Sequence, residues 1–163
     1  MSFTPSGRQS LSYGLNSLSG FSLKQLVSWG DHLEIGQPQI DAQHHAIFDI
    51  AIEIADIWHK RGALDQLKTV TDKLDRVLRA HFQFEEQELA ELGYERLAEH
   101  RAEHAVILGE LRTIRNRLED MGPGTVLAEP GFLVLSFVLG VTVGHLNHSD
   151  TDYCELTRTT APR

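Results

Sequence analysis

The chain has 163 residues, enough to bury the core of one domain. It carries 15 Lys and Arg against 23 Asp and Glu, and the resulting net charge of −8 argues against a nucleic-acid partner. A single cysteine, Cys154, excludes a disulfide framework and any multi-cysteine metal site. The longest apolar run, residues 132–143, is shorter than a membrane span, and no signal peptide is visible. We therefore expect a soluble, cytoplasmic protein without a membrane span.

Residues 1–27 differ in composition from the rest of the chain. They contain seven serines, three glycines, two basic residues and no acidic residue. This composition predicts a flexible or partly helical extension with little to bury, although Leu11, Leu15 and Leu18 have helical spacing and leave a short docking helix open. Such an extension is a candidate surface for a protein partner. Residues 157–163 are expected to form a C-terminal tail.

Four later segments repeat apolar residues every three or four positions, which is typical of amphipathic helices. Gly62 and Gly93 are placed to end the first two helices, and Pro130 suits the first turn of the fourth. The sequence contains no alternating strand pattern and no internal repeat. We predict an all-α protein, in which residues 28–156 form an up-and-down antiparallel four-helix bundle. The stripes run over residues 40–58, 67–88, 97–118 and 135–145.

Histidines interrupt all four of these core-facing stripes. An imidazole on a bundle seam costs free energy unless both nitrogens find partners, and a shared metal ion would satisfy several rings at once. His100 and His104 are four residues apart, so their rings project from one helix face. Glu85 follows His81 at the same spacing and brings a carboxylate to the same level. A metal site is therefore predicted at His44, His81, Glu85, His100, His104 and His145.

The ligand types narrow the choice of metal centre. The cluster has no thiolate, which argues against a structural zinc site, and the stripes lack the Glu-x-x-His pairs of ferritin-like bundles. A haem would need two histidines rather than five. A histidine-rich set with few carboxylates suits two iron ions bridged by carboxylates. Five imidazoles, two bridging carboxylates and a bridging oxygen fill all but one position of two octahedra, which leaves room for a small ligand such as dioxygen.

The fourth helix offers two candidates for the remaining ligand. His148 lies three residues after His145, so a straight α-helix brings the two rings near each other. Asp150 lies five residues after His145, about 140° around an α-helix, and would point away. Helix geometry alone therefore favours His148. A helix end or a bulge near Asn147 would bring Asp150 round to the site instead.

The ordered set of motifs resembles a bacterial hemerythrin over residues 29–153. The resemblance implies a four-helix bundle with two iron ions and a bridging oxo or hydroxo group, in which one iron is held by three histidines and the other by two. It favours Asp150 over His148, because a bridge needs a carboxylate. By resemblance, His100, His104 and His145 hold one iron, His44 and His81 hold the other, and Glu85 and Asp150 bridge them. The matching segments are Ile40-Asp41-Ala42-Gln43-His44, His81-Phe82-Gln83-Phe84-Glu85-Glu86, His100-x-x-x-His104 and His145-x-x-x-x-Asp150-x-x-Tyr153.

The same resemblance implies a function. A monomer that binds dioxygen reversibly, as a carrier, store or sensor rather than an enzyme, is expected, with Ile47, Val141 and Leu146 forming the wall of the oxygen pocket. Val141 stands where the family usually has tryptophan, and a smaller side chain there favours the alternative of a di-iron peroxidase, oxidase or nitric-oxide-handling enzyme. Glu86 is expected on a solvated or interhelical face, and Tyr153 mainly in packing.

Overall fold

The computed structural model describes residues 34–153, with only the backbone at 147–149 and 151–152. The boundaries predicted at residues 27 and 156, both predicted tails and Cys154 lie outside these residues. The described part is helical and contains no strand. Its elements are α3 (Pro38–His59), α4 (Leu64–Glu91), α5 (Leu97–Glu119), α6 (Ala128–Leu139), a π-helical segment (Gly140–Ser149) and a final 3-10 turn (Asp150–Tyr153).

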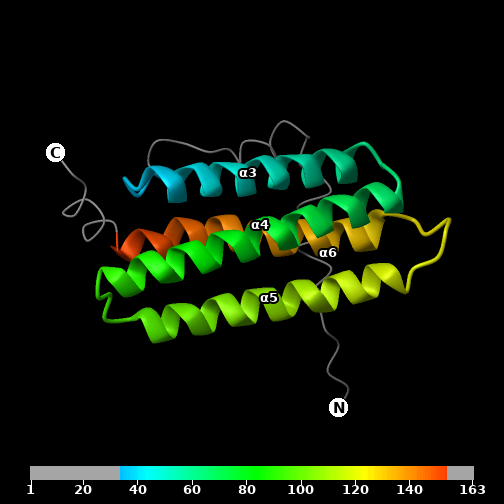
Figure 1. The fold of residues 1–163 in the computed structure, drawn as a ribbon. Helices are drawn as coiled ribbons and strands as arrows, with labels where there is room; N and C mark the ends of the chain where they lie inside the picture. Colours follow the sequence, from blue (N-terminus) through cyan, green and yellow to red (C-terminus); the bar gives the residue numbers. More distant parts are fainter. Residues whose placement is uncertain (1–33, 154–163) are drawn as a thin grey trace, which may run out of the picture.

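The helices run alternately up and down, and the π-helical segment continues directly from α6 (Figure 1). In the described chain, α3 packs against α4 and α6, and α4 packs against α5. The start of α3, the end of α4, the start of α5 and the 3-10 turn therefore lie at one end of the bundle. This architecture confirms the predicted all-α, up-and-down four-helix bundle.

Local capping positions the first helix. The Gln37 side-chain oxygen accepts hydrogen bonds from the backbone N–H groups of Gln39 and Ile40, at 2.7 and 2.8 Å, and so satisfies two amides at the start of α3. The Asp41 carboxylate accepts a further bond from the backbone N–H of Ile35 at 2.8 Å. These bonds fix the direction in which the chain enters α3, about two turns before its first histidine.

The expected helix ends are confirmed for α4 and wrong by one residue for α3. Gly93 follows α4 with φ of 70°, as a glycine that ends a helix should. After α3 it is Arg61, with φ of 52°, that adopts the left-handed conformation in place of Gly62. Gly62 instead donates its backbone N–H to the carbonyl of Ile57 at 2.9 Å. The two residues together form a Schellman ending, in which the glycine takes the second position.

Two apolar clusters enclose a polar layer. The larger cluster draws residues from all the long helices and from the π-helical segment, and it includes Ile47 and Phe82. The smaller cluster, made by Ile35, Ile40, Leu89 and Tyr153, closes the end where the chain enters α3. On α3, His44 lies between Ile40 of the smaller cluster and Ile47 of the larger one. The histidines are therefore held between two dry layers.

The last helical stretch carries the most apolar sequence of the described chain. Residues Ala128–Leu146 are long and apolar enough to span a membrane by length and composition alone, and 56% of this stretch is buried inside the bundle. This stretch is longer than the apolar run of residues 132–143 because it also includes polar positions such as Glu129 and His145. A buried core helix passes the same test, and here the stretch packs against α3 and α5.

Candidate metal centre

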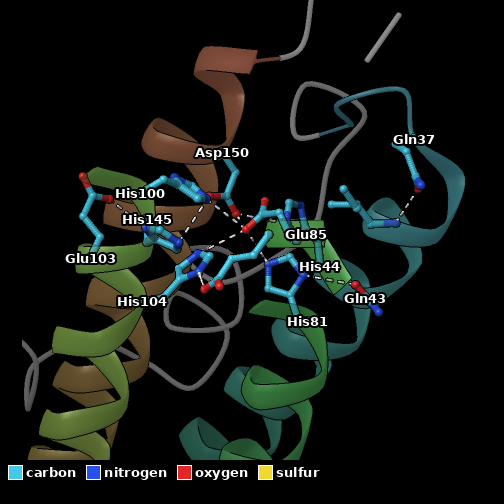
Figure 2. Close-up of polar contacts among 12 residues, drawn as sticks. Gln37, Gln43, His44, His81, Glu85, His100, Glu103, His104, His145 and Asp150 are labelled. Atoms are coloured by element: carbon cyan, nitrogen blue, oxygen red, sulfur yellow. Dashed lines mark hydrogen bonds and ion pairs between the residues drawn. The ribbon is translucent and has the colours of Figure 1, made fainter. Parts of the chain in front are cut away.

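All seven predicted ligand residues come together at the end of the bundle where α3 begins (Figures 1 and 2). α3 supplies one histidine, α4 a histidine and a carboxylate, and α5 two histidines. The last histidine comes from the π-helical segment, and the last carboxylate is the first residue of the 3-10 turn. Each of these residues is 5% exposed or less: His44, His81, Glu85, His100, His104, His145 and Asp150.

The ligand atoms fall into two overlapping groups. One group joins three histidines, His100, His104 and His145, to the two carboxylates, and the other joins His44 and His81 to the same carboxylates. The atoms within each group lie within 4.8 Å of one another. Because Glu85 and Asp150 belong to both groups, the arrangement suits two neighbouring metal ions that share two bridging carboxylates.

The two carboxylates occupy the middle of the cluster (Figure 2). Glu85 Oε2 lies 3.0 Å from His100 Nε2, 3.1 Å from His104 Nε2 and 3.8 Å from His81 Nε2. Asp150 Oδ2 lies 3.1 Å from His44 Nε2, and its Oδ1 lies 3.2 Å from His145 Nε2. Each carboxylate therefore contacts histidines of both groups.

The π-helical segment explains how Asp150 reaches the site. The backbone N–H of Asp150 donates to the carbonyl of His145, five residues earlier, so the wider turn places the two residues on one face. The Thr142 hydroxyl donates to the carbonyl of Val138 at 2.9 Å and competes with the regular α-helical pattern just where it ends. The bulge expected near Asn147 is therefore present, but it begins earlier than expected, at Gly140 and before His145. The side chain of the alternative candidate, His148, lies outside the described residues.

Outer hydrogen bonds orient three of the histidines. His104 Nδ1 lies 2.8 Å from Glu86 Oε1, and His145 Nδ1 lies 3.2 Å from Glu103 Oε2. An ionised carboxylate can only accept, so each of these Nδ1 atoms carries the ring proton and leaves the Nε2 lone pair facing inward. His81 Nδ1 similarly meets the amide oxygen Oε1 of Gln43 at 3.1 Å. Phe82 stacks on the His104 ring at 3.8 Å and further fixes its orientation.

These outer partners were not identified from the sequence. Glu86 does lie between helices, as expected, but its contact with a site histidine was missed. Glu103 immediately precedes His104 in α5, so helical spacing directs it away from that residue's stripe. It reaches His145 of the neighbouring segment instead, 42 residues along the chain. Contacts of this kind join separate helices and leave no signal in local spacing.

Inside the cluster, acceptor atoms face one another. Within the described chain, Nε2 of His81, His104 and His145 makes no hydrogen bond, and the same holds for Glu85 Oε1 and both carboxylate oxygens of Asp150. Leaving buried polar atoms unsatisfied costs about 1–3 kcal/mol each. Lone pairs that converge without donors are stabilised by a cation, and imidazole and carboxylate ligands suit iron and similar transition metals. The residues present therefore fit a metal centre.

Burial has the largest effect on protonation in the metal-free cluster. Burial lowers the pKa of His104 to about 2 and that of His81 to about 4, so both imidazoles stay neutral with a free lone pair. Burial also raises the pKa of Glu85 well above its usual range, and the Asp150 carboxylate adds to this effect. Metal binding at Glu85 would therefore release the proton of this carboxyl. Burial opposes ionisation of Asp150 too, but its contacts with His44 and His81 outweigh this and lower its pKa.

Comparison with known proteins decides the family. The model of the Hemerythrin HHE cation binding domain matches residues 36–154. The chain belongs to the hemerythrin family. It is 25% identical over 130 residues to a bacteriohemerythrin of Clostridium acetobutylicum, an alignment that covers 78% of this chain and 98% of that protein. It is 31% identical over 96 residues to a bacteriohemerythrin of Stenotrophomonas maltophilia, covering 58% of this chain and 61% of that protein. The resemblance noted in the sequence is thereby confirmed.

The three residues predicted to line an oxygen pocket are buried next to this hemerythrin site. Ile47 lies one turn after His44 on α3, and Leu146 directly follows His145. Both residues, together with Val141, belong to the larger apolar cluster, and Val141 is 2% exposed. They form part of the apolar layer on one side of the polar centre. Their contact with a bound gas molecule stays a prediction.

Proposed function

We propose that this hemerythrin-family chain holds two iron ions and binds dioxygen reversibly, as a carrier, store or sensor. One observation supports the metal site above all others. Three imidazole lone pairs and several carboxylate oxygens converge in a buried centre without hydrogen-bond donors for them. Family membership favours iron as the occupant, and the two overlapping groups of ligands favour two ions over one.

Each ligand has a role in this proposal. His100, His104 and His145 would hold one ion, His44 and His81 the other, and Glu85 and Asp150 would bridge them. Two reduced iron ions held in this way would supply the electrons that dioxygen takes up on reversible binding. The group with His44 and His81 offers fewer protein ligands than the group with three histidines, so a gas molecule would bind on that side.

The residues around the centre must also exclude water from it. Water and protons promote irreversible oxidation of ferrous iron, so reversible binding requires their exclusion. The larger apolar cluster covers the site from one side, and the smaller cluster of Ile35, Ile40, Leu89 and Tyr153 covers it from the other. Both bridging carboxylates are fully buried between these layers. The low-dielectric surroundings also strengthen every contact between the ligands and the ions.

Metal analysis and an oxygen titration test the proposal together. We expect two irons per chain, and an anaerobic reduced sample should gain a visible charge-transfer band with dioxygen and lose it on degassing. Irreversible oxidation without that band would refute reversible binding. His44→Ala should lose iron, whereas His45→Ala should retain it, because His45 is the exposed neighbour of His44 on α3. Equal iron contents in the two variants would argue against the assigned site.

A second candidate function rests on Val141. This buried position near His145 carries a side chain smaller than the tryptophan usual in the family. More space near the site would admit water or a second substrate, which favours a di-iron peroxidase, oxidase or nitric-oxide-handling enzyme. Sustained turnover of hydrogen peroxide or nitric oxide by the iron-loaded chain would support this alternative. A stoichiometric, reversible spectrum without turnover would support the dioxygen binder.

A further inference from the structure

The outer partners of the site histidines differ in charge. In the three-histidine group, His104 contacts the Glu86 carboxylate and His145 contacts the Glu103 carboxylate. In the two-histidine group, His81 contacts the neutral amide of Gln43. Figure 2 shows Gln43 and Glu103 on opposite sides of the cluster. The Nδ1 atoms of His104 and His145 therefore contact negatively charged groups, whereas Nδ1 of His81 contacts a neutral one.

We propose that Glu86 and Glu103 are positioning residues that favour oxidation of the ion bound by His100, His104 and His145. When a diferrous centre gives one electron to a one-electron oxidant such as ferricyanide, one ferrous ion becomes ferric and the oxidant becomes ferrocyanide. The inference is that the ferric ion formed is the one in the three-histidine group. This inference rests on the proposed di-iron function and deepens it.

Hydrogen bonding through the ring provides the physical link. A carboxylate that accepts the Nδ1 proton raises the electron density on the imidazole and makes Nε2 a more basic ligand. A ferric ion gains more from a basic ligand than a ferrous ion does, because its charge is higher. The effect is carried into a buried site, since His104 and His145 are 1% and 5% exposed. An amide such as Gln43 orients its histidine with a much smaller electronic effect.

Orientation alone does not require these charges. Phe82 already stacks on the His104 ring with an angle of 9° between the planes, so that ring is held by packing as well. Solvent and neighbouring charge reduce the influence of both carboxylates without removing it. The Glu86 side chain is 27% exposed and lies 3.3 Å from Arg101, and the Glu103 side chain is 47% exposed. The two carboxylates nevertheless act on the group with three histidines, whereas Gln43 brings no charge to His81.

Variants of the full, iron-loaded chain that remove or add one charge test this inference. Glu86→Gln and Glu103→Gln keep a hydrogen-bond acceptor and remove the charge, and Gln43→Glu adds a charge on the other group. Glu99→Gln is the matched control, because Glu99 precedes Glu103 by one turn of α5 and pairs with Arg96 at 2.8 Å. The measurements are iron content, the one-electron midpoint potentials from a mediated titration, and Mössbauer spectra of the singly oxidised state.

Glu86→Gln and Glu103→Gln should each favour the ferrous form of the ion in the three-histidine group about tenfold more than the parent chain does. This change corresponds to a rise of about 59 mV in its one-electron midpoint potential. Gln43→Glu should lower the potential of the other ion and reduce the difference between the two steps. Unchanged potentials with two irons bound would overturn the inference, as would an equal shift in Glu99→Gln. If the two Gln variants lose iron, the inference is tested by Gln43→Glu alone, and an unchanged difference between its two potentials would overturn it. A parent chain that binds no iron would overturn the proposed function itself.

Discussion

Acidification of the metal-free protein should destabilise it before any surface carboxylate titrates. In the folded chain His81 and His104 are buried and neutral, because burial lowers their pKa values to about 4 and about 2. In the unfolded chain both take up protons near the ordinary histidine pKa of about 6.5. The unfolded state therefore binds more protons below pH 6.5, and the free energy of unfolding falls as the pH falls. Above pH 7 neither residue contributes a pH dependence.

The size of the effect follows from the number of protons taken up. Each histidine contributes about 1.4 kcal/mol per pH unit between the two pKa values, so the pair contributes about 2.7 kcal/mol per unit. Glu85 acts in the opposite direction, because its raised pKa lets the folded state keep a proton that the unfolded state releases above pH 4.5. Asp150 matters only below pH 3.8, since its pKa is lowered from that value. Between pH 6 and pH 5 we expect a loss of about 1.4–2.7 kcal/mol.

Urea unfolding of chelator-treated protein across this range measures the loss. His104→Gln should reduce the slope by about 1.4 kcal/mol per pH unit, because one of the titrating imidazoles is gone. Val138→Ala is the control: Val138 is fully buried and does not titrate, so the variant should lose about 2 kcal/mol at every pH without a change of slope. A free energy of unfolding that stays constant from pH 6.5 to pH 5 would refute the linkage between burial and ionisation.

Four substitutions extend these expectations. Val141→Trp should slow irreversible oxidation of the oxygenated form, measured from its visible spectrum, at unchanged iron content. If the variant instead loses about 1–3 kcal/mol in its free energy of unfolding and oxidises at the same rate, Val141 contributes to packing alone. Gly131→Ala should cost about 1–3 kcal/mol in urea unfolding, because the added Cβ would overlap the Trp58 indole. Gly109→Ala, with open space around its Cβ, should instead gain about 0.5–1 kcal/mol. Asp150→Asn should weaken iron retention against a chelator at least about tenfold while the helix content by circular dichroism stays the same.

The helices were the most predictable part of the fold. The stripes of α3, α4 and α5 keep the spacing of three and four residues throughout, and Gly93 marks the end of α4 with a positive φ. The ending of α3 differed because Arg61 adopts the left-handed conformation, which is open to residues other than glycine at a modest cost. Periodicity therefore locates a helix reliably and its last residue less so.

The histidines of the site could be predicted from the sequence, whereas the outer carboxylates could not. Histidine at a core-facing position is unusual enough to be recognised one helix at a time, and the bundle topology then brings His44, His81 and His145 to the same level. The outer acceptors Glu86 and Glu103 have no such signal. Each is an ordinary charged residue on its own helix, and it contacts a site histidine only because two helices pack against each other.

Asp150 lies between these two cases, and its position shows where local rules end. Continued as an α-helix, the chain after Leu139 would present residue 148 to the site and turn residue 150 away. The observed π-helical segment aligns Asp150 with His145 through a single backbone hydrogen bond, and the sequence signals for it are only Thr142 and two nearby glycines. Such segments are rare and are frequently found at functional sites. This geometry brings the Asp150 carboxylate within 3.1 Å of His44 and 3.2 Å of His145, a placement that a regular α-helix would not give.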